Sequence, residues 1–96
     1  MIPQDRRECD SPLAELAFDR FKGIGDEEYG PFNPDTDTRD LFEETRQELA
    51  DALVYSWFIE EKHGEEGLSA LIDLRKHLVA ADNAVSRVEL LSLRKR

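Results

Sequence analysis

Apolar side chains recur along most of the chain at spacings of three and four residues, which is the pattern of amphipathic helices. It predicts a first helix at about 12–22, because Ser11 can cap a helix and Pro12 fits its first turn. Residues 1–10 are polar and we expect them to be frayed. The segment 23–38 is rich in Gly, Pro, Asn and Asp and predicts a long loop, which in so small a domain is functional or mobile.

A second, longer helix is predicted at about 38–62, with Asp37 or Thr38 as its cap and Gly64 as its stop. Its second half contains the run LVYSWFI at 53–59, which is apolar on nearly every side of a helix. We therefore expect other helices or another subunit to cover this run on several sides.

Apolar positions predict a third helix at about 66–81 and a fourth, shorter one within 83–96 that ends in a basic tail. Asp82 or Asn83 is expected to break the chain between them. Neither a β-like alternation of useful length nor an internal repeat is visible. The expected fold is all-α, a single domain over 1–96 built as a small bundle of three to four helices and completed by a homodimer or homotetramer.

Composition agrees with a folded protein that has a large polar surface, since 40% of the 96 residues are hydrophobic and 36% are charged. The longest apolar run is far shorter than the ~20 residues of a membrane span, so no membrane association is expected. The N-terminal stretch has no apolar segment of the kind found in secretion signals. The single cysteine, Cys9, cannot form an internal disulfide, and we expect a cytoplasmic protein with an incidental surface thiol.

The net charge of −9 is concentrated in residues 26–51, which carry ten acidic residues against Arg39 and Arg46. Phosphate groups would be repelled there, so direct nucleic-acid binding by this half is not expected. Two interpretations remain. The acids gather divalent cations, or they form a plain solvated face.

The most regular acids form what we call the carboxylate ladder, made of Asp40, Glu44, Glu48 and Asp51. At ~100° per residue these four fall within an arc of roughly 80°, and Tyr55 shares the sector. Neighbouring like charges at these spacings cost a few tenths of a kcal/mol each on an exposed helix. A bound Mg²⁺ would reverse the sign of that interaction. Because the sector continues into Tyr55, we expect the ladder to point towards a covered region.

The segment FEETRQELADALVYSWF resembles the metal-binding helix of the all-α nucleoside triphosphate pyrophosphohydrolases, the MazG-like superfamily. That family pairs an E-x-x-E motif on one helix with an E-x-x-D motif on the next, followed by an apolar run with a tyrosine. Here Glu48 and Asp51 form the E-x-x-D, and Tyr55 follows. The resemblance implies Mg²⁺, with Mn²⁺ as a substitute, held by these acids, and a metal-activated water that attacks a nucleotide's phosphate chain and releases pyrophosphate.

The resemblance covers about twenty residues, and the upstream E-x-x-E helix is missing. Glu15 and Asp19 on the first helix are a poor substitute. Glu44, one turn before the E-x-x-D, is the expected third metal ligand and catalytic residue. Asp40, Glu43 and Asp73 are weaker candidates, and each has a plain alternative role as helix-start charge or as part of a solvated helix face.

Other sites are less well supported by the residues. Asn33–Asp37 lacks the glycine of a calcium-binding loop and is better explained as a turn and a cap. His63 and His77 have no cysteine nearby, which argues against zinc. Base recognition would use aromatic side chains, and the sequence does not choose among Tyr29, Phe32 and Tyr55. The basic ending 94–96 either reaches a substrate phosphate or is a solubilising tail.

Two functions from different classes follow from these patterns. The first is a Mg²⁺-dependent pyrophosphohydrolase that uses Glu44, Glu48 and Asp51 and takes a nucleotide substrate, with Tyr55 as the expected substrate contact. The second is a non-catalytic acidic helical protein that binds a basic partner or mimics nucleic acid.

Overall fold

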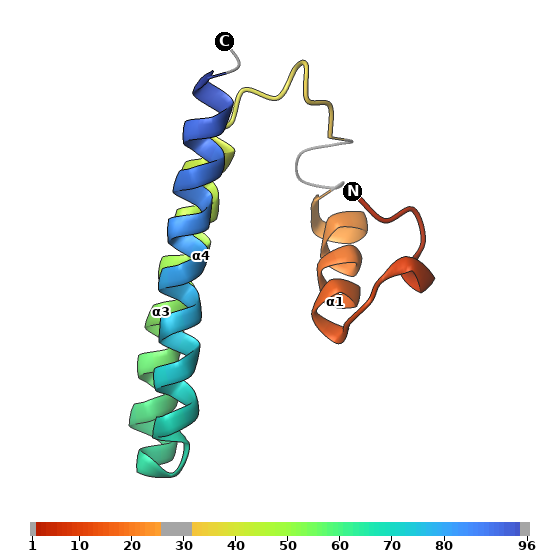
Figure 1. The fold of residues 1–96 in the computed structure, drawn as a ribbon. Coiled ribbons are helices and arrows are strands. Elements are labelled where there is room, and N and C mark those ends of the chain that lie inside the picture. Colours follow the sequence, from red (N-terminus) through yellow and green to blue (C-terminus); the bar gives the residue numbers. More distant parts are fainter. Residues whose placement is uncertain (1, 26–31, 95–96) are drawn as a thin grey trace. The chain divides into compact units, whose positions relative to one another are not determined.

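The computed structural model describes residues 2–25 and 32–94, and every regular element in these ranges is a helix. The all-α expectation is confirmed in this coarse form, and two of the helices are long (Figure 1). The residues group into two compact units, Met1–Thr38 and Arg39–Arg96. Each unit is described by itself below.

The first unit contains the predicted first helix. A 3₁₀ turn, η1 (Arg6–Glu8), lies within the stretch that we expected to be frayed. Helix α1 (Pro12–Arg20) begins as predicted, because the Ser11 hydroxyl accepts a hydrogen bond from the Ala14 N–H at 3.1 Å. It continues into one π-helical turn, η2 (Phe21–Gly25). Arg6 Nε lies 3.3 Å from Asp19 Oδ1, which joins η1 to α1.

Residues 26–31 of the predicted loop, including Tyr29, lie outside the described residues, and the description resumes at Phe32. The Asn33 side chain accepts a hydrogen bond from the Asp35 N–H at 2.9 Å, which closes an Asx turn. This agrees with the turn interpretation of the segment.

Helix α3 (Leu41–His63) is the predicted second helix, but it begins later than expected. Its cap is Asp40, whose carboxylate accepts a hydrogen bond from the Glu43 N–H at 3.1 Å, so the prediction of Asp37 or Thr38 as the cap is wrong. Gly64 ends the helix as predicted, with a φ of 72° that favours glycine.

Helix α4 (Leu68–Arg94) is continuous, and the predicted break at Asp82 or Asn83 is wrong. The predicted helices at 66–81 and within 83–96 are therefore one element. Asp and Asn lower helix propensity only by tenths of a kcal/mol, and no Gly or Pro interrupts the segment. Asp82 Oδ1 also lies 3.9 Å from Arg46 Nε of α3, and this ion pair favours a helical backbone at Asp82.

The second unit is a helical hairpin in which α3 and α4 pack side by side, joined by the 3₁₀ turn η3 (Gly64–Gly67) (Figure 1). Only Leu71 and Ser56 are buried among the described residues. The expectation that 53–59 is covered on several sides does not hold in the single chain, since Tyr55, Trp57 and Phe58 are 64%, 50% and 59% exposed. One side of α3 is packed and the others are open.

None of the helices in the two described ranges combines the length and the apolar character that crossing a bilayer requires.

Candidate functional site

The carboxylate ladder lies on the side of α3 that faces away from α4. Contacts to α4 come from Arg46, Ser56 and Glu60, which all lie in the opposite half of the helix at ~100° per residue. All four ladder acids are exposed. The expectation that the ladder points towards a covered region is therefore wrong for the single chain, because the covered side is the one that packs on α4.

The four ladder acids differ in their hydrogen bonds and ion pairs. Asp40 caps α3 through the Glu43 N–H, and Glu44 Oε2 lies 3.7 Å from Arg39 Nη1. Glu48 and Asp51 have no hydrogen bond or ion pair within the part of the chain that the structure describes. Of the four ladder acids, the two without a hydrogen bond or ion pair among the described residues are thus Glu48 and Asp51, which form the E-x-x-D motif.

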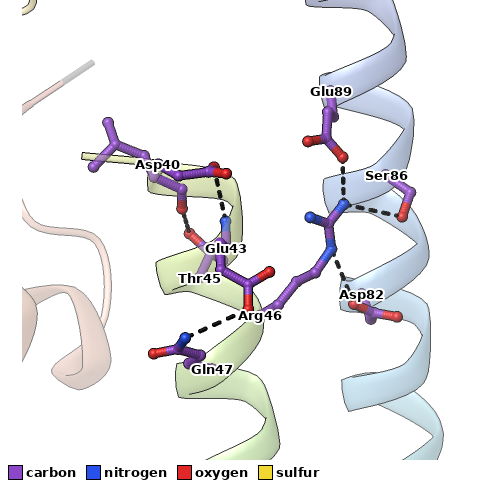
Figure 2. A network of polar contacts seen from close by, with 9 residues as sticks. Asp40, Glu43, Thr45, Arg46, Gln47, Asp82, Ser86 and Glu89 are labelled. Atoms are coloured by element: carbon purple, nitrogen blue, oxygen red, sulfur yellow. Dashed lines mark hydrogen bonds and ion pairs between the residues drawn. The ribbon is translucent and has the colours of Figure 1, made fainter. Parts of the chain in front are cut away.

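Glu43 is one of the weaker candidates, and it is partly engaged within α3. Its carboxylate accepts a hydrogen bond from the Gln47 amide at 3.4 Å, beside the cap made by Asp40 (Figure 2). A local structural role therefore explains both of these acids.

Arg46 is the cation on α3 nearest to the ladder in sequence, and it is committed to the other helix. Its Nη2 donates to Glu89 Oε1 at 2.6 Å and to Ser86 Oγ at 3.4 Å, and its Nε lies 3.9 Å from Asp82 (Figure 2). The hydrogen bond with Glu89 raises the pKa of Arg46, so the guanidinium stays charged. The repulsion between Glu48 and Asp51 is therefore not relieved by this arginine.

Two aromatic side chains continue the ladder sector towards the end of α3. The rings of Tyr55 and Phe58 meet edge to face, with centroids 6.1 Å apart and an interplanar angle of 84°. Both side chains are more than half exposed. The outer face of α3 therefore carries carboxylates first and then an open aromatic pair, about one helical turn further along.

Asp73, His63 and His77 do not join the ladder. Among the described residues, no group of three or more His, Cys, Asp or Glu side chains is placed to hold a metal ion. Asp73 and His77 are exposed on α4, as expected for a solvated helix face. A cation at Glu48 and Asp51 would therefore take its remaining ligands from water, from substrate or from another chain.

A polar cluster that the sequence patterns did not predict joins α3 to α4. Arg75 Nε donates to Ser56 Oγ at 3.0 Å, Arg75 Nη2 donates to the Ser56 carbonyl at 3.2 Å, and the same nitrogen lies 2.9 Å from Glu60 Oε1. Ser56 is fully buried. A signal was available, because Ser56 is the one polar residue within the apolar run 53–59 and shares the helix sector of Leu49 and Leu53.

Cys9 in the first unit has no catalytic setting. It is partly buried beside Glu8 and Phe18, in a hollow between η1 and α1. Loss of solvation, together with the nearby carboxylate of Glu15, raises the pKa of its thiol. A nucleophilic cysteine needs a lowered pKa, so the interpretation as an incidental thiol agrees with this environment.

Comparison with known proteins gives no match: no family model, no curated protein and no solved structure is similar to the chain.

Proposed function

We propose that the protein is a Mg²⁺-dependent nucleoside triphosphate pyrophosphohydrolase of the MazG-like kind. The observation that carries the proposal is the outer face of α3, where Glu48 and Asp51 stand one turn apart, exposed and without a partner among the described residues. Keeping two such carboxylates unpaired costs stability, and the nearest arginine is used elsewhere. A cation that binds between them makes the arrangement favourable.

The donor chemistry fits magnesium. Carboxylate oxygens are its preferred protein ligands, and Mg²⁺ is commonly bound by one or two carboxylates together with waters and substrate phosphates. Glu48 and Asp51 supply the two carboxylates, and Glu44 is the third ligand if it leaves Arg39, 3.7 Å away. Bound Mg²⁺ or Mn²⁺ offsets phosphate charge and makes water a better nucleophile.

The residues around the acids have roles in this proposal that follow from their places on α3. Tyr55 lies one turn after Asp51, and with Phe58 it offers an exposed aromatic surface on which a base can stack. Asp40 and Glu43 stay with the helix start. The E-x-x-E helix of the family has no counterpart on α3, so the remaining acidic ligands are supplied by a second chain or by substrate.

The test is pyrophosphate release from a panel of canonical and modified nucleoside triphosphates with Mg²⁺ or Mn²⁺. We expect pyrophosphate release by the wild type. In Glu48→Gln and Asp51→Asn the rate should fall 100-fold or more, which corresponds to about 3 kcal/mol in the activation barrier. Glu66→Gln changes an exposed carboxylate in η3, away from the ladder, and should retain full activity. No pyrophosphate from any nucleotide would refute the proposal.

A second function is favoured by a separate observation. The hairpin carries many exposed apolar side chains beside its acidic face, which is the composition of a surface that binds another protein. In this alternative the protein is non-catalytic, and the ladder attracts a basic partner. It predicts tight binding of a lysine-rich peptide at physiological salt, weakened in Glu48→Gln, without nucleotide hydrolysis. The absence of such binding would exclude it.

A further inference from the structure

An apolar groove runs along one edge of the helical hairpin. Its walls are Leu49, Ala50 and Leu53 from α3 and Leu78 and Val79 from α4, and the Arg46–Asp82 pair lies at one end. Past Val79 the hollow continues along α4 beside Ile72, Arg75 and Lys76. We call this surface the groove edge.

Large apolar side chains lie at both ends of the groove edge on α4. Four large side chains on this helix fall within an arc of about 60° and are between 44% and 61% exposed: Ile72, Val79, Leu90 and Leu93. On α3, Trp57 lies in the sector of Arg46 and Leu53 and is 50% exposed. A single chain thus leaves open apolar side chains on both helices, and on α4 the polar residues Arg75 and Ser86 separate them within the same arc.

The hairpin by itself has little core to stabilise it. Leu71 is the one apolar side chain that is buried among the described residues. Domains of about 60 residues are marginal even when they bury a normal core. Covering the groove edge would therefore add apolar burial that the single hairpin lacks.

We infer that the groove edge is the contact surface for a second copy of this chain, so that two hairpins form a four-helix bundle. With a two-fold axis parallel to the helices, α3 of each copy lies antiparallel on α4 of the other. α3 is about 35 Å long and two helices are about 20 Å wide, which gives about 700 Å² per copy. That is close to the ~800 Å² per partner of a standard stable interface.

The charges at the margins of the groove edge fit this arrangement. On the α3 side the margin carries Glu43 and Glu61, which are eighteen residues apart and so share one position on the helix. On the α4 side it carries Lys76, Arg87 and Arg94, all exposed. Because each α3 lies on the partner's α4, the acidic margin of one copy meets the basic margin of the other.

The inference does not depend on the proposed enzyme activity, and it is tested on the full chain by sedimentation equilibrium. Val79 and Val88 make a matched pair, because both are on α4, are 58% and 56% exposed, and lie on opposite sides of the helix. We expect a wild-type dimer, loss of the dimer in Val79→Glu, and a dimer that persists in Val88→Glu. A monomeric wild type, a dimeric Val79→Glu, or equal loss in both variants would overturn the inference.

A milder substitution covers the case in which Val79→Glu fails to fold. Val79→Ala removes two methyl groups per chain and should raise the dimer dissociation constant on the order of 10- to 100-fold. Val88→Ala should leave it within about twofold. In parallel, Trp57 fluorescence should shift to shorter wavelength as protein concentration rises through the dissociation constant. A fluorescence spectrum that is independent of concentration, or equal effects of the two alanine variants, would contradict the groove edge as the contact surface.

Discussion

At the scale of single residues, a buried serine and a half-buried arginine hold the helical hairpin together. Ser56 is fully buried, and its hydroxyl both donates to the Leu53 carbonyl at 2.6 Å and accepts from Arg75 Nε at 3.0 Å. A buried polar group is stable only when it is paired in this way. Glu60, 2.9 Å from Arg75, neutralises the charge at the same point. The cluster fixes which faces of α3 and α4 meet.

Ser56→Ala removes the acceptor of the Arg75 Nε–H and leaves this partly buried donor without it. We expect the free energy of unfolding to fall by about 1 to 2 kcal/mol. Urea denaturation at one fixed protein concentration measures this, because association also changes apparent stability. Ser69→Ala, at an exposed site on α4, should have no such cost. Equal stability of the two variants would show that the cluster contributes nothing.

Cys9 gives a prediction on pH. Loss of solvation and nearby carboxylates raise the pKa of its thiol, so less thiolate is present at a given pH than for an ordinary cysteine. Alkylation of the folded chain should therefore rise with pH at a higher midpoint than alkylation in denaturant. Measuring the rate against pH under both conditions tests this. The same midpoint in both would contradict a perturbed thiol.

The residue scale is where sequence patterns were weakest. Asp37, Thr38 and Asp40 are all good caps, and only the backbone conformation selects Asp40, which is extended while the following residues are helical. The sequence alone suggests that Arg46 is a solvated cation, whereas in the structure its Nη2 lies 2.6 Å from Glu89 Oε1 of α4. Contacts of this kind depend on the register between two helices, which a single sequence does not specify.

At the scale of elements, the end of α3 depends on a glycine. Gly64 has a φ of 72° and a ψ of −153°, a conformation that side chains other than glycine rarely adopt. Gly64→Ala should lower the free energy of unfolding by about 1 to 3 kcal/mol. Gly67, in the same turn, has open space around its Cα and no positive φ. Gly67→Ala should be neutral or slightly stabilising in thermal unfolding, and a reversed order of the two would refute this explanation.

The continuity of α4 can be tested at Asn83, which is exposed in the middle of the helix. Asn83→Ala should stabilise the protein by about 0.5 kcal/mol, because alanine has the higher helix propensity. Asn83→Pro should destabilise it by ~3 kcal/mol or more, through a lost hydrogen bond and a steric clash. Circular dichroism during thermal unfolding measures both. Tolerance of proline would mean that the chain does break here.

Helices were predicted well where the spacing of apolar residues was regular and a capping residue or glycine marked the helix end. The spacing located α3 within a few residues, and Ser11, Pro12 and Gly64 marked real boundaries. Helix α4 does not break at Asp82, although Asp is a common helix cap, because the apolar periodicity continues through Val85 and Val88. Such propensities amount to tenths of a kcal/mol, and helix packing overrides them.

In the molecule as a whole, the groove edge and the carboxylate ladder lie on different sides of the hairpin. The groove edge includes Arg46, Ala50 and Trp57, which lie about 80° or more around α3 from the ladder sector. Association through the groove edge would therefore leave Glu48 and Asp51 accessible. The apolar run 53–59 predicted cover on several sides, and in the single chain this is wrong because α4 covers only one side of α3.

Binding of a divalent cation by Glu48 and Asp51 can be measured by titration with Mn²⁺ followed by electron paramagnetic resonance, which counts free ions. We expect wild type and Glu66→Gln to bind Mn²⁺ with the same affinity, Mg²⁺ to compete, and the affinity to fall at least tenfold in Glu48→Gln and in Asp51→Asn. Equal binding by all four proteins, or no binding by the wild type, would contradict this expectation.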